Sequence, residues 1–160
     1  MDITRRALFL GGFVALAGGA LAAGAVLRPR QLAPARVYSE RGLAIRGTDP
    51  VAYFTEGRPR AGDPSITHLW TGATWAFVTA ENRDRFAAEP TAYAPQYGGF
   101  CAWAVAAKGQ LFSTQPENWA IVDGKLYLNF NDDVQATWDA DRAGFISLGD
   151  MRWPEIVAET

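Results

Sequence analysis

The chain has few of the side chains that bind metals or act as nucleophiles. Its 160 residues include one cysteine, Cys101, one histidine, His68, and two methionines. A single cysteine cannot form an internal disulfide, and these two residues cannot supply the four ligands of a Cys/His structural zinc site. Gly-x-Ser-x-Gly, His-Glu-x-x-His and glycine-rich phosphate-binding motifs are also missing. The sequence therefore favours binding over catalysis.

Charge is sparse as well. Charged residues make up 20% of the chain, and the formal net charge is −2. The sequence after Arg36 contains no cluster of Lys and Arg, the feature that gives nucleic-acid-binding proteins their basic surface. We therefore expect no nucleic acid partner.

No charged residue interrupts positions 7–27, an apolar stretch that follows Arg5 and Arg6. Two cations, an apolar segment and then small residues are typical of an export signal. The paired arginines, followed by Leu8 and Phe9, resemble the twin-arginine type. The alternative is an ordinary signal peptide in which they are only its positive start. Either type predicts an exported, periplasmic protein.

The sequence offers more than one end for this signal. Residues 20–22 and 23–25 both have the small-x-small pattern that a signal peptidase requires. Positions 7–27 are also about as long as a membrane-spanning helix of ~20 residues. We favour cleavage, with an uncleaved anchor as the alternative, and we expect membrane contact only through this segment. The sequence thus divides into a signal peptide or signal anchor (1–27), a linker (28–36) and one domain (37–160).

Two hairpins are predicted in that domain. Residues 66–70 and 74–78 are rich in β-branched and aromatic side chains and flank a Thr-Gly-Ala turn. Residues 119–122 and 125–130 flank Asp123-Gly124, and an Asp-Gly pair between apolar runs is a strong hairpin signal.

A helix is expected after each hairpin. Thr79 can cap a helix over 80–88, which Pro90 stops, and Asn131 can cap one that runs to about Asp141. The fold class is therefore α+β: a small single domain of antiparallel hairpins, each followed by a short helix and all preceded by the apolar signal helix. Six tryptophans and a 49% hydrophobic content predict a packed core. We assign Trp119, Trp138 and Trp153 to that core and to C-terminal packing.

Most of the candidate functional residues lie between the helix predicted over 80–88 and the hairpin predicted at 119–130. Two adjacent glycines permit a sharp turn that presents the following residues, and aromatic rings would partly shield the Cys101 thiol. The candidate ligand-binding residues are Tyr97, Gly98, Gly99, Phe100 and Trp103. In the alternative interpretation these aromatics are core and the glycines form an ordinary loop.

Several segments, in order, resemble the YHS domain family. They are residues 47–54 (GTDPVAYF), 67–77 (THLWTGATWAF), 80–86 (AENRDRF) and 90–101, which ends in YGGFC. Exported, stand-alone members of the family continue with a segment similar to residues 119–129. The resemblance extends from about Gly47 to Trp153.

The resemblance implies soft-metal binding, because YHS domains of copper-exporting ATPases are thought to bind metal through cysteines. In those domains one cysteine follows the Asp-Pro-Val segment and another follows the second hairpin strand. Here the corresponding positions hold Ala52 and residues 78–79, without a thiol. The remaining metal ligands are His68 and Cys101. A thiolate and an imidazole suit copper(I), so we expect a copper or other soft metal ion as the cofactor.

Two other functions stay open. The first is a binding module for a non-metal small molecule or a protein, which would use the aromatic surface of Trp70, Trp75, Tyr97 and Trp103. The second is nucleophilic catalysis by a Cys-His pair, with Asp49 or Asp84 orienting the imidazole.

Overall fold

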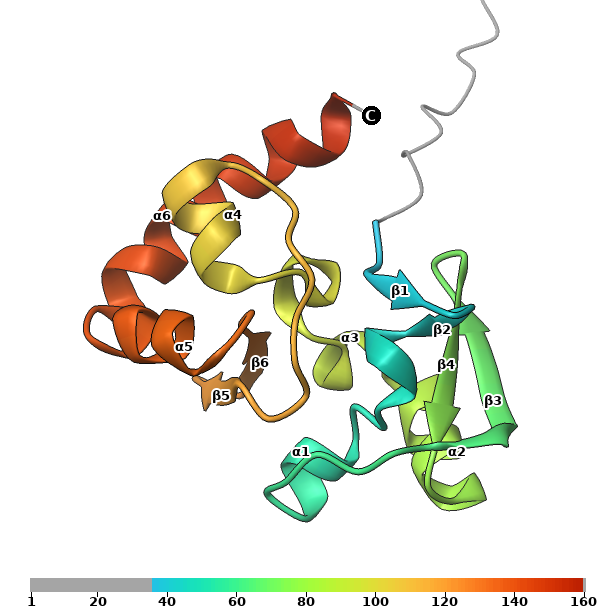
Figure 1. Ribbon diagram of the computed structural model, residues 1–160. Helices are drawn as coiled ribbons and strands as arrows, with labels where there is room; N and C mark the ends of the chain where they lie inside the picture. The colour runs from blue at the N-terminus through green and yellow to red at the C-terminus, as the bar shows by residue number, and fades with distance from the viewer. Residues whose placement is uncertain (1–35, 160) are drawn as a thin grey trace, which may run out of the picture. The chain divides into compact units, whose positions relative to one another are not determined.

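The computed structural model describes residues 36–159 (Figure 1). The predicted signal and most of the linker lie outside the described residues, so the export predictions stay predictions. The described part of the chain is α+β, with three separate two-stranded antiparallel sheets and several short helices. Within residues 36–159, no helix has both the length and the apolar character needed to cross a membrane.

Each sheet is a hairpin. The strands are β1 (Ser39–Glu40) and β2 (Leu43–Ala44), β3 (Asp63–Trp70) and β4 (Ala73–Phe77), and β5 (Trp119–Val122) and β6 (Lys125–Leu128). Both predicted hairpins are confirmed. Their two-residue turns, Thr71-Gly72 and Asp123-Gly124, have positive φ at both positions, as the twist of a tight hairpin requires.

The two predicted helices are also confirmed. They are α2 (Ala80–Ala88) and α5 (Asp132–Asp139), and the side chains of Thr79 and Asn131 cap them by accepting bonds from Asn82 N and Val134 N. Helix α5 ends two residues before the predicted Asp141. That residue instead caps the next helix, where its carboxylate accepts a hydrogen bond from Gly144 N.

The remaining helices were not predicted. They are η1 (Ile45–Gly47), α1 (Ala52–Thr55), α3 (Pro90–Tyr93), η2 (Gln96–Gly99), α4 (Ala102–Lys108) and α6 (Arg142–Ala158). The longest, α6, contains Gly144, Gly149 and Pro154, residues that ordinarily argue against a helix.

Two hydrophobic cores meet at β6. Leu126 and Leu128 are buried in a core with Trp75, Phe77 and Phe86 of β4 and α2. Tyr127, between those leucines, is buried in a second core with helices α4, α5 and α6. Successive side chains of a strand point to opposite faces, so β6 separates the two cores. In Figure 1, β3, β4 and α2 lie on one side of the described domain and α4, α5 and α6 on the other.

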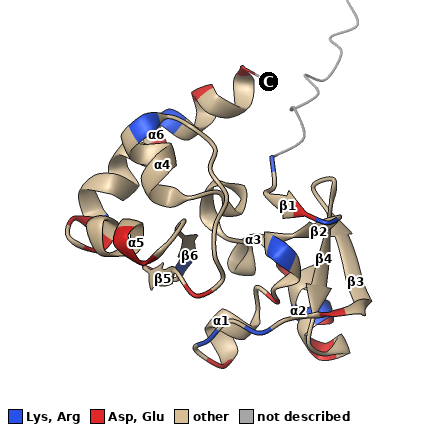
Figure 2. Ribbon diagram, in the orientation of Figure 1, with Lys and Arg blue, Asp and Glu red and all other residues tan. Residues whose placement is uncertain are grey.

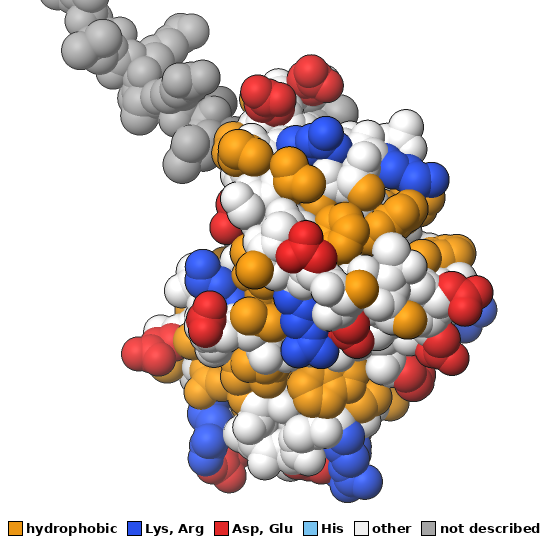
Figure 3. Space-filling view, turned by 90° about the vertical axis from the view of Figure 1, so that its left-hand side faces the viewer, with side chains coloured by type: hydrophobic (Ala, Val, Ile, Leu, Met, Phe, Trp, Pro, Cys, Tyr) orange, Lys and Arg blue, Asp and Glu red, His pale blue; other side chains and the backbone are white. Residues whose placement is uncertain are grey.

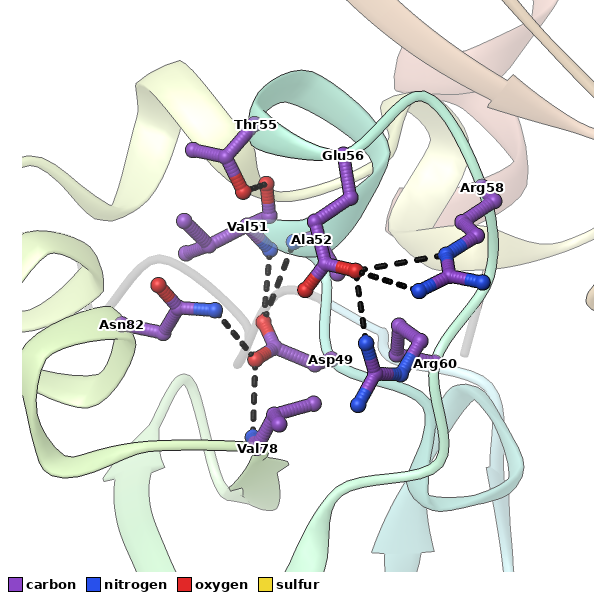
Figure 4. Close-up of polar contacts among 9 residues, drawn as sticks. All are labelled: Asp49, Val51, Ala52, Thr55, Glu56, Arg58, Arg60, Val78 and Asn82. Carbon is purple, nitrogen blue, oxygen red and sulfur yellow. Dashed lines mark hydrogen bonds and ion pairs between the residues drawn. The ribbon is translucent and has the colours of Figure 1, made fainter.

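A buried carboxylate joins three elements of the first core (Figure 4). Asp49 is fully buried and accepts hydrogen bonds from Val51 N at 2.8 Å, Ala52 N at 3.3 Å, Val78 N at 2.8 Å and Asn82 Nδ2 at 2.7 Å. It therefore holds the start of α1, the end of β4 and α2 together. These bonds give the Asp-Pro-Val segment a structural role.

Charged side chains are spread over the surface. Figure 2 shows Lys, Arg, Asp and Glu residues on many different elements. On the face shown in Figure 3, hydrophobic side chains lie in patches between charges of both signs.

Candidate functional site

The Cys101 thiol is fully buried at the start of α4, whereas the sequence predicted a partly shielded sulfur. Its Sγ lies 3.6 Å from Oδ1 of Asn129. The Cys101 backbone is also bonded, because its N–H donates to the Phe112 carbonyl and its carbonyl accepts from Val105 N. Burial raises the pKa of the Cys101 thiol, and hydrogen bonds from backbone N–H groups offset this only in part. The neutral thiol is a poor nucleophile and a poor metal ligand.

Asn129 makes the thiol part of a buried polar network. Its Oδ1 also accepts from Trp103 N at 3.1 Å, and its Nδ2 donates to Gln135 Oε1 at 3.0 Å. The Asn129 N–H donates to the Asn118 carbonyl at 2.7 Å. Because these bonds tie the end of β6 to the starts of α4 and α5, the surroundings of Cys101 suit a structural role.

His68 lies elsewhere in the fold. It sits half-buried on β3, opposite Trp75, and its ring centroid is 6.2 Å from that of Phe86. Figure 1 shows β3 and α4 well apart. Among residues 36–159, no hydrogen bond joins His68 to Cys101, and no three His, Cys, Asp or Glu side chains are arranged to hold a metal ion. The predicted two-ligand metal site stays a prediction.

The double glycine permits a close backbone approach. Tyr97, Gly98 and Gly99 have φ values of 54°, 61° and 81°, in the region that favours glycine. A Cβ on Gly98 would overlap the carbonyl oxygen of Arg36, and the Gly98 carbonyl accepts from Tyr38 N at 2.9 Å. A Cβ on Gly99 would likewise overlap the side chain of Ile45. The pair lets segment 36–38 and η1 pack directly on η2.

Tyr97 connects η2 to α6. Its buried hydroxyl lies 2.9 Å from Asp150 Oδ1 and 3.1 Å from the Ile146 carbonyl oxygen, so its single proton is shared between two acceptors. Burial raises the pKa of Tyr97, and the bond to Asp150 raises it further. The ring lies 5.8 Å from that of Trp153, centroid to centroid. Tyr97 therefore positions Trp153, which the sequence assigned only to packing.

A pocket of about 360 Å³ opens beside Tyr97, within the range of about 300–1,000 Å³ that small-molecule sites occupy. Its walls come from Trp70 and Trp75 of the β3–β4 hairpin, the segment 94–98, and Trp153 of α6. These elements belong to different parts of the sequence, and they present mainly apolar surface.

Two polar groups of the hairpin wall, Trp75 Nε1 and the Thr71 hydroxyl, are already engaged. Trp75 Nε1 donates to the Trp70 carbonyl at 3.3 Å, and Thr71 Oγ1 donates to the same oxygen at 2.8 Å. The two indole rings lie 6.0 Å apart, centroid to centroid. Because these contacts fix the aromatic wall, the pocket is largely preformed.

Four other lining residues have polar side chains available for a ligand. Within the described part of the chain, no side-chain hydrogen bond or ion pair engages the lining residues Arg36, Thr91, Gln96 and Lys125. An apolar cavity with a few unengaged polar groups is the usual form of a binding site for a small molecule.

The predicted ligand-binding residues are divided among four places. Tyr97 and Gly98 line this pocket, and Phe100 lines an adjoining hollow of about 430 Å³ that shares Arg36, Val37 and Thr71 with it. Gly99 is buried against Ile45. Trp103 lies on α4, where the Lys108 ammonium is 5.2 Å from its ring centroid.

Sequence reasoning missed Arg36, Pro95, Gln96, Lys125 and Trp153 as lining residues. No sequence signal links Trp153 or Lys125 to residues 94–98, because only the folded chain brings them together.

Comparisons with protein families, with curated proteins and with solved structures gave no match. The resemblance to YHS domains therefore stays a prediction.

The buried thiol gives a prediction about reactivity and alkaline pH. We expect Ellman's reagent to modify Cys101 in the folded chain at least about tenfold more slowly than in the urea-unfolded chain, because the thiolate is both inaccessible and disfavoured. The folded thiol holds its proton more tightly than the unfolded one, whose pKa is about 8.5. Stability should therefore fall as pH rises past that value.

The matched variant is Cys101→Ala. Urea midpoints measured at about pH 7.5 and about pH 9.5, on either side of the ordinary thiol pKa, should fall less in this variant than in the unaltered chain. Rapid modification of the folded protein, or an equal fall in both proteins, contradicts the assignment.

Proposed function

We propose that this chain is a binding module for small molecules and that its site is the pocket walled by Trp70, Trp75, Tyr97 and Trp153. One observation carries the proposal: aromatic side chains from three separate segments surround a cavity of ligand size, and four polar side chains of its lining, those of Arg36, Thr91, Gln96 and Lys125, have no partner within residues 36–159. Aromatic side chains supply a large hydrophobic contribution to binding. The fixed hairpin wall reduces the ordering cost that a ligand would otherwise have to offset.

The chemistry of the lining favours binding over catalysis. Among residues 36–159, the lining contains no His, Cys, Asp or Glu. General acid–base catalysis at neutral pH usually depends on such groups. The one tyrosine hydroxyl, that of Tyr97, is bonded to Asp150 and its pKa is raised. The pocket therefore offers contact and orientation to a ligand.

Metal binding at Cys101 and His68 has weaker support. A soft metal needs the deprotonated thiolate, and burial of Cys101 disfavours that form. Copper analysis of the full chain beside Cys101→Ser and His68→Ala measures this second possibility directly. The proposed site lies outside the cytoplasm if the Arg5-Arg6 segment directs export, which rests on the sequence pattern alone.

A neutral two-ring aromatic probe tests the pocket. We expect 2-naphthamide to bind the full-length chain saturably at one site in a calorimetric titration. Trp70→Ala and Trp153→Ala should each weaken that binding by about tenfold or more, since burying a large ring contributes roughly 1.5–3 kcal/mol. The variants alter different elements, so a folding defect in one leaves the other informative.

The matched control is Trp103→Ala. Trp103 is half-buried on α4 and does not line the pocket, so its removal should leave the affinity unchanged. Equal losses in all three variants, or absence of saturable binding both of 2-naphthamide and of its anionic counterpart 2-naphthoate, overturns the proposed function.

A further inference from the structure

We infer that the ligand of this pocket is a small organic anion with a flat apolar body. The inference rests on the proposed function, because it names the chemical class that the same pocket selects.

The charged residues of the described lining have one sign. Within residues 36–159, they are Arg36 and Lys125. Neither forms an ion pair within residues 36–159, whereas other arginines do, as Arg85 does with Glu81 at 2.7 Å. Two unpaired cations beside one apolar cavity, in a chain of net charge −2, leave a positive charge that an anion can neutralise.

The two cations come from separate segments, Arg36 from the chain before β1 and Lys125 from the start of β6. A guanidinium presents a fork of N–H donors that matches a carboxylate, and an ammonium adds a compact charge. The Gln96 amide and the Thr91 hydroxyl can donate further hydrogen bonds. The apolar body would then lie against the tryptophan walls.

The same charges argue against a cationic ligand. Aromatic-lined sites often bind quaternary ammonium groups through the faces of their rings. Here Arg36 and Lys125 would repel such a group, and no lining carboxylate would attract it. The volume of about 360 Å³ is near the lower end of the usual range, which favours a compact ligand over a peptide.

Two probes of the same shape but different charge test whether the pocket prefers an anionic ligand. 2-Naphthoate and 2-naphthamide share the two-ring body, but only the first is anionic. We expect the full-length chain to bind 2-naphthoate about tenfold more tightly. Lys125→Gln and Arg36→Gln should each reduce that preference, measured as the ratio of the two affinities, by about threefold or more, because each variant weakens the binding of 2-naphthoate more than that of 2-naphthamide. Raising the salt to about 1 M, where charges are screened beyond about 3 Å, should also reduce it.

Lys108→Gln is the matched control, because Lys108 also lies near aromatic rings, those of Trp103 and Phe112, but outside the pocket. Lys108→Gln should leave the preference for 2-naphthoate over 2-naphthamide unchanged. Equal binding of the two probes, or tighter binding of the amide, overturns this inference and leaves the proposed function standing. Binding of neither probe overturns both.

Discussion

Replacing Asp49 by alanine is expected to lower the free energy of unfolding by about 3–5 kcal/mol. The buried carboxylate accepts four hydrogen bonds that join α1, β4 and α2 (Figure 4). Its removal leaves the buried N–H groups of Val51 and Ala52, and the half-buried one of Val78, without an acceptor. Each unsatisfied buried group costs about 1–3 kcal/mol. Urea unfolding of the full chain, followed by circular dichroism, measures the loss.

Asp63→Ala is the matched control for this prediction. Asp63 also accepts a backbone and a side-chain hydrogen bond, from Ser65 N at 2.8 Å and Ser65 Oγ at 2.7 Å, but it is exposed. Water can replace those bonds, so the loss should be about 1 kcal/mol or less. Similar losses in the two variants would mean that the Asp49 network does not stabilise the domain.

The second large effect is expected from Gly98→Ala. The new Cβ would overlap the carbonyl oxygen of Arg36, which belongs to the backbone and cannot rotate away. Segment 36–38 must then move, and the bond from Tyr38 N to the Gly98 carbonyl is lost. We expect a loss of about 3 kcal/mol or more, combining about 1–2 kcal/mol for an alanine at positive φ with the cost of the overlap.

Gly124→Ala isolates the first of these two costs. Gly124 has a φ of 72°, close to the 61° of Gly98, but beyond its own chain neighbours no heavy atom lies within 4 Å of the point that a Cβ would occupy. Its replacement should cost only about 1–2 kcal/mol. If both variants lose the same stability in urea unfolding, the close approach of segment 36–38 is not what requires glycine at position 98.

Local signals predicted the β3–β4 and β5–β6 hairpins and the helix after each, because those features depend on neighbouring residues; the short β1–β2 hairpin was not predicted. Asp123-Gly124 adopts the positive φ values that a tight turn needs, and Thr79 and Asn131 cap the helices that follow. Helix α6 escaped prediction because its stability comes from tertiary packing. Its Gly149 lies directly against the Tyr97 hydroxyl, where a larger residue would not fit.

The candidate site was predictable only in part, for the same reason. The glycine pair drew attention to Tyr97 and Gly98, which do line the pocket. From the sequence, we interpreted the glycine pair as a turn that presents Cys101. In the structure, the lack of side chains at these glycines allows segment 36–38 and η1 to pack closely against η2. Residue type alone suggested His68 and Cys101 as partners, and type carries no information about which side chains the fold brings together.

The most direct test of the account is to locate a bound aromatic ligand on the protein. In the full-length chain saturated with 2-naphthamide, intermolecular nuclear Overhauser effects should connect the naphthalene protons to the rings of Trp70, Tyr97 and Trp153, which line the pocket. Contacts confined to the aromatic surface of Trp103 and Phe112, around Lys108, would contradict the assignment of the pocket as the binding site.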